Sequence, residues 1–394
     1  ETLQHARTTV PFYRDRLPAA PLEDLGALAR IPMLTKAEVR TAGRAMISTA
    51  FAARTLHSVH TGGTTGTPLT IHCDRSALQR NYSFFSRFQE SMDLPPRPRV
   101  ATFAGRAILE PGQDRPPYWR RNFAGNSLLC SSYHLSADTI PHYVDALARF
   151  NPEVIDSYPS SIEGIARYVR ERCITSIRPT AIITSSETLR PNVRRTIEDA
   201  FGCRVYDHYG AAEMAAFVTQ CSHGAYHCNS DYGIVEVIRD GRPAAPGEMG
   251  EIVATGFINP VMPFVRYATG DFAVRGASSC RCGRGFPILA RIVGRMDDVL
   301  VTPEGRMVGR LDPVFKAVSS ITETRIVQDE VDHVRAEWVG DRMLTDGEAA
   351  SLRAELRSRL GPSMRIDLVR VPRIARTAGG KFRSVVNLVT VSRS

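Results

Sequence analysis

The stretch that decides the fold is HSVHTGGTTGTPLT, residues 57–70. Seven consecutive positions within it, 61–67, hold only threonine or glycine, and apolar or β-branched residues flank them. This pattern predicts two short strands joined by a tight loop. Glycines let the backbone approach a ligand closely, and threonine hydroxyls can donate to an anion. The loop is therefore a candidate cradle for a polyphosphate. Its candidate phosphate-binding residues are Thr61, Gly62, Gly63, Thr64, Thr65, Gly66 and Thr67.

Two other interpretations of this loop are a Walker A loop and an ordinary hairpin turn. A Walker A loop is excluded, because Pro68 stands where that motif has lysine and no Gly-Lys-Ser/Thr follows. An ordinary polar hairpin turn has the same composition. The loop alone does not decide between a turn and a phosphate site, so the rest of the chain must.

Length and composition describe an ordinary globular protein. The 394 residues suggest two or three domains, with 43% hydrophobic and 23% charged residues. No apolar stretch approaches the roughly 18 residues of a membrane span, and the N-terminus has no signal-peptide pattern. We therefore expect a cytoplasmic protein without a membrane partner. Because the sequence starts at Glu1, some leading residues are expected to be missing.

The formal net charge is +9, which would attract a nucleotide, coenzyme A, an acidic carrier protein or nucleic acid. Nucleic acid is not expected, because the chain has no run of five basic residues and no nucleic-acid-binding motif. The basic residues are almost all arginine. Lysine occurs only at Lys36, Lys316 and Lys381, so each of these is a candidate for chemistry.

Predicted strands and helices alternate between residues 99 and 210, which favours a parallel sheet with helices on its faces. Three helix starts are predicted locally: Thr35 and Ser160 as N-caps, and Pro191 in a first turn. Ligands of such sheets bind beyond the carboxyl ends of the strands. The polar turns SYPSS (157–161), SSET (185–188) and HYGAAE (208–213) all lie there.

After residue 230 the pattern changes to alternating strands joined by Gly and Pro turns, which predicts an antiparallel β-rich subdomain. The final part alternates strands and helices as a small two-layer α+β domain. The prediction is an α/β protein with a large N-terminal domain, residues 1–294, and a small C-terminal domain, residues 295–394.

Two motifs follow predicted strands. In HYGAAEM (208–214), Tyr209 could stack on a nucleobase and Glu213 could hold Mg²⁺, which prefers hard oxygen ligands. The alternative is a helix N-terminus with Glu213 in its first turn. In RYATGD (266–271), Asp271 could accept both hydroxyls of a ribose. The alternative there is a plain β-turn.

Two further motifs lie near or after the predicted boundary. GRMDDVL (294–300) is either a hinge or a charged linker, and TAGGKFR (377–383) presents Lys381 or is a flexible tail. Each of the motifs alone also fits its simpler explanation. Their occurrence together, in this order, is far more specific than any one of them.

In these motifs the chain resembles the acyl-adenylate-forming superfamily. That superfamily shares a Thr/Gly phosphate loop, Tyr-Gly-x-x-Glu, Thr-Gly-Asp, a Gly-Arg-x-Asp-Asp hinge and a Gly-Lys near the C-terminus. The chain is similar above all to the phenylacetate–coenzyme A ligase family, in its capsular-polysaccharide-biosynthesis-type branch. The segments that carry the similarity include VPFYRDRL, MLTKAEVR, DSYPSSI, GEIVATG, CRCGRG, GRMDDVLVTPEGR and GGKFR.

The resemblance implies a role for each matching residue. The Thr/Gly loop would hold the phosphates of ATP, Glu213 the Mg²⁺ and Asp271 the ribose. Lys381 would be the catalytic lysine of adenylation, with Glu213 as the second catalytic group. Ser185, Ser186 and Glu187 would line the adenine side, with Tyr209 stacking on the base and Gly210 beside it as a further nucleotide-binding residue. Arg295 would contact the ribose or a phosphate, and Asp297 would be the hinge of a mobile C-terminal domain.

The eight cysteines of a chain without secretion signals suggest metal ligands or chemistry before disulfides. One Cys/His cluster spans residues 221–228 and a second pair lies in CRC, residues 280–282. Soft ligands in two pairs suit tetrahedral Zn²⁺, and some members of the resembling family carry such a site. The expected ligands are Cys221, His227, Cys280 and Cys282, and the site would be structural because four ligands leave no open position. The alternative is a set of reduced, buried cysteines.

The predicted function is ATP-dependent activation of a small-molecule carboxylic acid, expected to be aromatic, as an acyl adenylate with release of pyrophosphate. The acyl group would then pass to coenzyme A, with an amine, a carrier-protein thiol or another nitrogen nucleophile as open alternatives. Residues 94–135 resemble the capsular-type branch, so phenylacetate itself does not follow from the resemblance. A phosphotransferase or NTPase, and a catalytically silent binding protein, are the alternatives outside the family.

Overall fold

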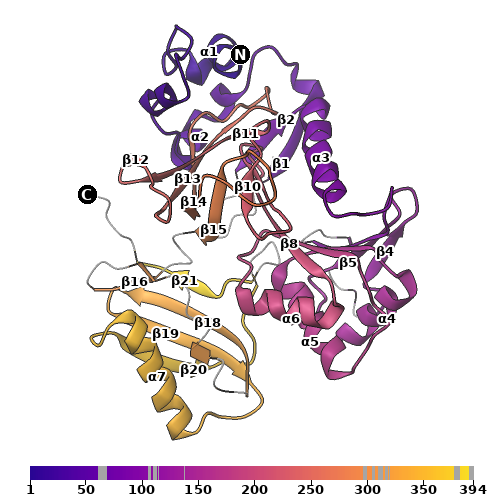
Figure 1. The fold of residues 1–394 in the computed structure, drawn as a ribbon. Coiled ribbons are helices and arrows are strands. Elements are labelled where there is room, and N and C mark those ends of the chain that lie inside the picture. Colours follow the sequence, from indigo (N-terminus) through magenta and orange to yellow (C-terminus); the bar gives the residue numbers. More distant parts are fainter. Residues whose placement is uncertain are drawn as a thin grey trace. The chain divides into compact units, whose positions relative to one another are not determined.

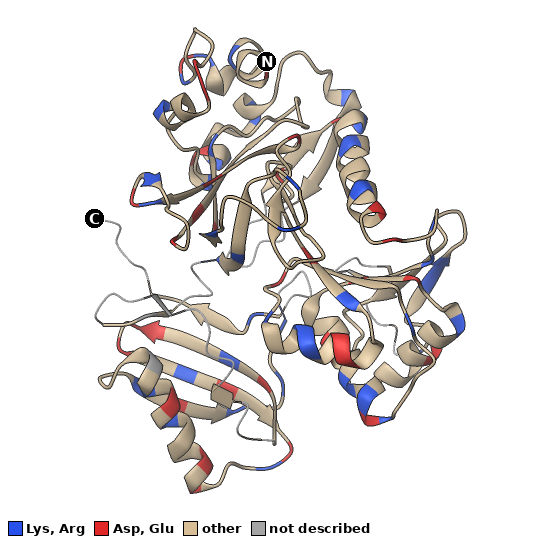
Figure 2. Cartoon of the chain, viewed as in Figure 1, with Lys and Arg blue, Asp and Glu red and all other residues tan. Residues whose placement is uncertain are grey.

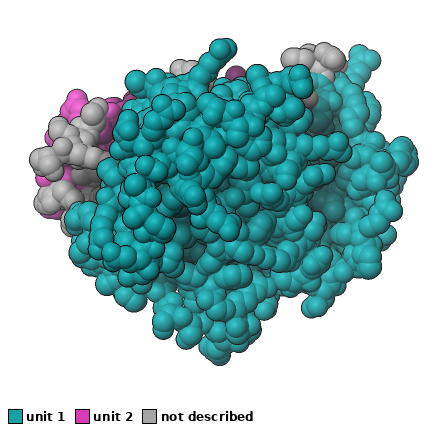
Figure 3. All heavy atoms as spheres, turned by 90° about the horizontal axis from the view of Figure 1, so that it is seen from above, with its two compact units in different colours: residues 1–292, 378–380 teal, residues 293–377, 381–394 magenta. Residues whose placement is uncertain are grey.

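The computed structural model describes residues 1–394 except 61–68, 105–107, 110–112, 114, 137, 296–299, 304–306, 309–313, 316–317, 319, 377–381 and 390–394. The chain forms two compact units (Figures 1 and 3). Unit 1 covers residues 1–292, and unit 2 covers most of residues 293–394. None of the helices in the described part of the chain has both the length and the apolar composition needed to cross a bilayer.

One large sheet of thirteen described strands forms the frame of unit 1 (Figure 1). Its strand order is β12-β11-β13-β14-β15-β10-β9-β8-β7-β6-β3-β5-β4. The five strands from β5 to β8 pair in parallel; they are β3 (Val100–Ala104), β5 (Ser127–Ser131), β6 (Val154–Ser157), β7 (Ala181–Ser185) and β8 (Arg204–Gly210). The parallel sheet and the β-rich region are thus one continuous sheet.

The remaining strands of the sheet are antiparallel wherever their pairing is described, and β8 joins the two halves through β9. They are β4 (Trp119–Asn122), β9 (Phe217–Gln220), β10 (Tyr226–Cys228), β11 (Gly233–Arg239), β12 (Arg242–Pro243), β13 (Met249–Gly256), β14 (Tyr267–Arg275) and β15 (Ile288–Arg295).

Three amphipathic helices pack on the parallel strands: α4 (Ile140–Phe150), α5 (Pro159–Glu171) and α6 (Pro191–Phe201). Leu147, Ile162 and Ile197 are fully buried in the shared core. The predicted strand and helix alternation is confirmed, and so is Pro191 in the first turn of α6. The predicted Ser160 cap is wrong, because α5 already starts at Pro159 with Tyr158 as its N-cap.

The N-terminal segment lies against β14. It contains α1 (Thr2–Thr9), α2 (Lys36–Ala42) and 3-10 helices at Pro11–Tyr13, Gly26–Arg30, Gly43–Met46 and Ala53–Thr55. The predicted Thr35 cap is confirmed as a complete capping box with Glu38. Buried Arg266 fixes the segment, because its guanidinium donates to the carbonyls of Ala29 and Ile31 and to both carboxylate oxygens of Glu236.

The predicted strands around the Thr/Gly loop are confirmed. They are β1 (His57–His60) and β2 (Thr70–Cys73), which pair antiparallel, while residues 61–67 themselves lie outside the described residues. Helix α3 (Arg75–Glu90) follows, with Asp74 as its N-cap. Its exposed side carries Arg75, Arg80 and Arg87, which Figure 2 shows as blue bands along the helix. Its other side packs aromatic rings onto the sheet.

Unit 2 is the predicted small α+β unit. Its main sheet has the order β20-β19-β18-β21, and α7 (Asp346–Leu360) adds Leu352, Leu356 and Leu360 to the core beneath it. The strands are β18 (Ile321–Glu330), β19 (His333–Gly340), β20 (Arg365–Arg370) and β21 (Val385–Asn387), with β16 (Leu300–Val301) and β17 (Met307–Val308) as a separate pair.

Candidate active site

The polar residues predicted for the nucleotide meet where β8 ends. Tyr209 is the second-last residue of β8, and its hydroxyl donates to Asp271 Oδ2 of β14 at 2.9 Å. Burial and the negative charge of Asp271 raise the pKa of Tyr209 well above its usual range, so the hydroxyl stays protonated as a donor. The structure thus brings together the residues predicted to stack on the base and to bind the ribose, 62 residues apart in sequence.

Local backbone geometry presents the Asp271 carboxylate. A register shift between Glu251 and Val253 interrupts the β13–β14 pairing, and Gly270 has φ 77° in β14. Glycine adopts this left-handed conformation without strain. The backbone N–H of Asp271 donates to Thr269 Oγ1 at 3.1 Å, and that hydroxyl donates to the carbonyl of Ile252. The carboxylate therefore lies on a β-bulge that these two hydrogen bonds stabilise, and bulges are common beside active sites.

Glu213, the predicted Mg²⁺ ligand, is buried at 8% exposure and accepts a hydrogen bond from the Tyr267 hydroxyl at 3.0 Å. Burial raises the pKa of Glu213, while the positive charge of Lys36 opposes that rise. Lys36 is the first residue of α2. No sequence motif predicted Lys36 at this site. The only signal for it was that lysine is rare in this chain, which has three.

The predicted adenine-side residues form the turn after β7. Ser185 is half-buried and Ser186 is exposed, and Ser186 has φ 68°. The Glu187 carboxylate accepts hydrogen bonds from the backbone N–H and the hydroxyl of Ser160, both at 3.0 Å. Glu187 thereby satisfies an N–H at the start of α5 that has no partner within the helix. These two hydrogen bonds tie the turn after β7 to the start of α5.

Several predicted residues cannot be placed. Thr61–Thr67, Asp297 and Lys381 lie outside the described residues. Arg295 is half-buried at the end of β15 and is grouped with unit 2. For these residues the assigned roles stay predictions.

The four predicted metal ligands form one cluster at the edge of β9 and β10. Cys221 follows β9, His227 lies on β10, and Cys280 and Cys282 lie between β14 and β15. One ligand atom from each lies within 4.8 Å of all the others. Cys221 Sγ lies 3.8 Å from Cys280 Sγ, and Cys282 Sγ lies 3.2 Å from His227 Nε2. All eight cysteines are free thiols.

These distances fit a tetrahedral metal site. Two thiolates that are each about 2.3 Å from a tetrahedral zinc ion lie about 3.8 Å apart, whereas a disulfide needs about 2.05 Å. A hydrogen bond from the backbone N–H of Cys282 lowers the pKa of the Cys280 thiol, which favours the thiolate that a metal requires. Three sulfurs and one imidazole nitrogen are a donor set typical of structural zinc.

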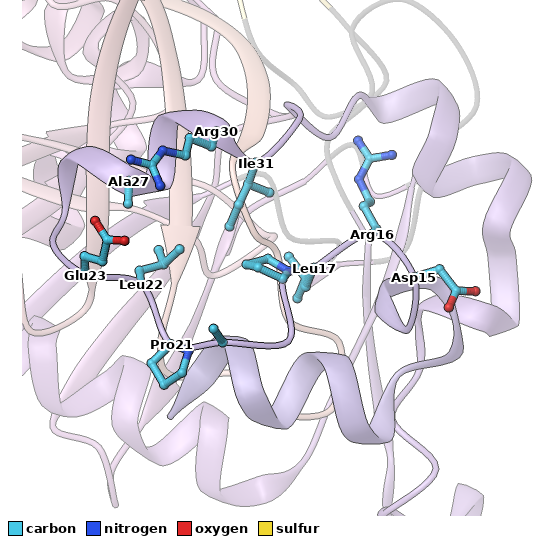
Figure 4. A pocket seen from close by; sticks show the side chains of 11 residues that line it. Asp15, Arg16, Leu17, Pro21, Leu22, Glu23, Ala27, Arg30 and Ile31 are labelled. Atoms are coloured by element: carbon cyan, nitrogen blue, oxygen red, sulfur yellow. The ribbon is translucent and has the colours of Figure 1, made fainter.

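A crevice of about 410 Å³ lies elsewhere, within the N-terminal segment (Figure 4). Leu17, Leu22 and Ile31 line its apolar side, and Arg16 lies at its rim. The Arg16 guanidinium is already bound to Glu38 at 2.8 Å. None of the predicted site residues lines this crevice, so it is separate from the candidate active site.

Comparison with known proteins finds relatives that match nearly the whole chain. The model of the CapK C-terminal domain matches residues 300–388. The protein CapK of Staphylococcus aureus is 28% identical, with 91% of this chain and 80% of CapK covered. A phenylacetate–coenzyme A ligase of Thermus thermophilus is 24% identical, with 96% of this chain and 92% of the ligase covered.

These relatives and the solved structures that share the fold support the acyl-adenylate-forming superfamily. The sequence is phenylacetate–coenzyme A ligase-like and similar to the CapK branch. Its fold is that of a 2-hydroxyisobutyryl-CoA ligase solved in the postadenylation state with an acyl-AMP, at TM-score 0.77, 21% identity and coverage of 98% and 87% of the two chains. An anthranilate CoA ligase in complex with anthranoyl-AMP has TM-score 0.60, 14% identity and coverage of 83% and 65%. This protein is thus an adenylate-forming ligase, and the reaction of its class is ATP-dependent formation of an acyl adenylate.

Proposed function

We propose that this enzyme activates an aromatic carboxylic acid as its acyl adenylate and transfers the acyl group to coenzyme A. The observation that carries the proposal is the hydrogen bond between Tyr209 and Asp271 at the end of β8, with Glu213 in the turn that follows. An aromatic face, a ribose-binding carboxylate and a metal-binding carboxylate meet there. That set suits the nucleotide half of ATP and its Mg²⁺.

The chemistry asked of these residues is positioning and charge neutralisation. The carboxylate of the acid attacks the α-phosphorus of ATP, the P–O bond to pyrophosphate breaks, and pyrophosphate leaves. Asp271 would hold the ribose, and Glu213 would hold a Mg²⁺ ion, which would supply positive charge to offset that of the phosphates. Burial raises the pKa of Glu213, and the positive charge of Lys36 offsets part of that rise, which favours the ionised form that a metal ligand needs. Fixed dipoles and charges of this kind act strongly where water is excluded.

The names of the relatives support the acid and the acceptor. Phenylacetate and anthranilate, named in two of the relatives, are aromatic acids, and those relatives and the 2-hydroxyisobutyryl-CoA ligase are CoA ligases by name. An amine or a carrier-protein thiol would replace coenzyme A in the second step only. A phosphotransferase or NTPase would instead form ADP.

The test is exchange of labelled pyrophosphate into ATP across a panel of carboxylic acids. We expect exchange that depends on an aromatic acid, formation of AMP, and a thioester when coenzyme A is added. Formation of ADP with a productive acid would overturn adenylation. AMP formation without any thioester would overturn coenzyme A as the acceptor and leave the first step in place.

Asp271→Ala is expected to lower kcat/KM for ATP by about ten- to a hundredfold. A charge-assisted hydrogen bond is worth roughly 1.5–3 kcal/mol, at about 1.4 kcal/mol for each tenfold change. Initial-rate kinetics with varied ATP would measure the loss. The matched control is Asp240→Ala, because Asp240 is exposed and pairs only with neighbouring Arg239 at 3.5 Å among the described ion pairs. Unchanged ATP kinetics in a folded Asp271→Ala protein would remove Asp271 from the site.

We also infer that the Cys221, His227, Cys280 and Cys282 cluster holds one structural Zn²⁺. The donor set and the sulfur spacing support this inference. Such an ion would be closed to substrate, because its four positions are taken by the protein.

A further inference from the structure

The imidazole of His208 is buried without a hydrogen-bond partner. His208 is 7% exposed, and both of its ring nitrogens are shielded from solvent and unpaired among the described residues. Buried polar groups in native proteins are nearly always hydrogen-bonded, and each exception calls for an explanation. An apolar side chain would fill the same space without leaving buried polar atoms unpaired.

Aromatic rings surround His208. The ring centroids of Phe217, Phe85 and Phe88 lie 4.5, 4.9 and 6.2 Å from the centroid of the imidazole. Phe85 and Phe88 come from α3, and Phe217 starts β9. These rings surround the imidazole with apolar surface, and aromatic side chains of this kind are typical of the walls of pockets that bind small organic ligands.

His208 lies on the opposite face of β8 from Tyr209, because side chains alternate along a strand. The same face carries Gly210, which is exposed at the strand end. A β-carbon on Gly210 would lie 2.8 Å from His208 Cε1 and 3.0 Å from Nε2. Any side chain larger than glycine at position 210 would therefore press on the polar edge of the imidazole, at the end of the strand where the nucleotide residues meet.

We propose that His208 selects the acid, and that the acid is an aromatic carboxylic acid whose ring carries a hydroxyl or amino group that hydrogen-bonds to the imidazole. The proposal rests on the proposed function. The two faces of β8 then hold the two substrates: the Tyr209 face the nucleotide and the His208 face the acid. The carboxylate of the acid reaches the phosphate past Gly210.

The chemistry of the ring fits such a substituent. Burial lowers the pKa of His208 to about 3, so the imidazole is neutral at physiological pH. A neutral imidazole has one N–H donor and one bare acceptor nitrogen. Hydroxyl and amino groups can meet either of them. A carboxylate or ammonium substituent would gain no ion pair from a neutral ring.

The experiment compares acids in pyrophosphate exchange: benzoate against its hydroxy and amino derivatives, and phenylacetate against its hydroxy derivatives. We expect the wild-type enzyme to prefer the best substituted acid over its parent by at least about a hundredfold in kcat/KM, because a buried hydrogen-bonding site rejects a ligand that leaves it unpaired. His208→Phe keeps the aromatic packing and should reduce that preference to below about tenfold. The control His142→Phe changes an exposed histidine of α4 and should leave the preference unchanged.

A second measurement separates this inference from the proposed function. In protein with ¹⁵N-labelled histidine, a binding acid should shift the imidazole nitrogens of His208, assigned by their loss in His208→Phe. This shift without pyrophosphate exchange would support the inference and overturn the adenylation function. Exchange with equal use of substituted and parent acids, or an unchanged preference in His208→Phe, would overturn the inference and leave the function standing. Absence of any shift with every acid of the panel would also overturn the inference.

Discussion

Lys381→Ala is expected to slow formation of the acyl adenylate by about 10²–10³-fold. An electrostatic contact made mainly in the transition state is typically worth about 3–4 kcal/mol. The lysine ammonium is a compact cation with three donors, suited to bridging a carboxylate oxygen and a phosphate oxygen. Lys381 lies outside the described residues, so its role rests on the sequence TAGGKFR and on the family. Pyrophosphate exchange with saturating acid would measure the loss.

The second half-reaction distinguishes this role from general damage. Transfer from a supplied acyl adenylate to coenzyme A should proceed at close to the wild-type rate in Lys381→Ala. Lys316→Ala is the matched control, because it removes another of the three lysines and should spare both steps. Asp297→Pro, at the predicted hinge, should spare the first step and slow the second. Equal slowing of both half-reactions in Lys381→Ala, or of neither, would contradict the assignment.

Loss of the metal from the Cys/His cluster is expected to lower the melting temperature by roughly 8–16 °C. An ion present at a thousand times its Kd stabilises the folded state by about 4 kcal/mol, and each kcal/mol shifts the melting temperature of a large domain by about 2–4 °C. Cys280→Ser or treatment with a chelator should produce this shift. Elemental analysis of the untreated protein should find about one zinc per chain.

Cys173→Ser provides the control for the metal experiment. Cys173 is an exposed free thiol outside the cluster, so its loss should change neither the zinc content nor the melting temperature. The chelator should clearly lower the melting temperature but leave the rate per folded enzyme molecule nearly unchanged, because the cluster has no open position for substrate. Untreated protein that contains no zinc, has all four ligands free to react, and melts at the same temperature with and without the chelator would refute a zinc site.

Features set by neighbouring residues were predictable from the sequence. The capping box of Thr35 and Glu38 spans one helical turn, and the strands on either side of the Thr/Gly loop are bounded by their own turn residues. The cluster of metal-binding residue types was also predictable, because cysteine and histidine are chemically conspicuous in any sequence. Its closure into one group of four depends on the pairing of β10 with β15, which brings the CRC loop to His227.

Features set by distant contacts were not predictable. The start of α5 depends on Pro159 and on Glu187, which is 27 residues from the Ser160 that it binds. The influence of Lys36 on Glu213 and the burial of His208 among α3 aromatics depend on packing between elements far apart in the chain. No local periodicity encodes these contacts. The hydrogen bond between Tyr209 and Asp271 also depends on contacts between distant strands, although the sequence motifs that contain the two residues could be recognised.

The pairing of β8 with β9 has a consequence for which way the site residues point. Tyr209 lies opposite Val218, and Val218 lies opposite Cys228 on β10, so one hairpin sets the alignment of β8. A slip by one residue would turn every β8 side chain to the other face and exchange the positions of Tyr209 and His208. The predicted metal ligands Cys221 and His227 lie on either side of the turn of that hairpin. A metal ion bound there would stabilise the hairpin, and with it the register that puts Tyr209 and His208 on their respective faces of β8.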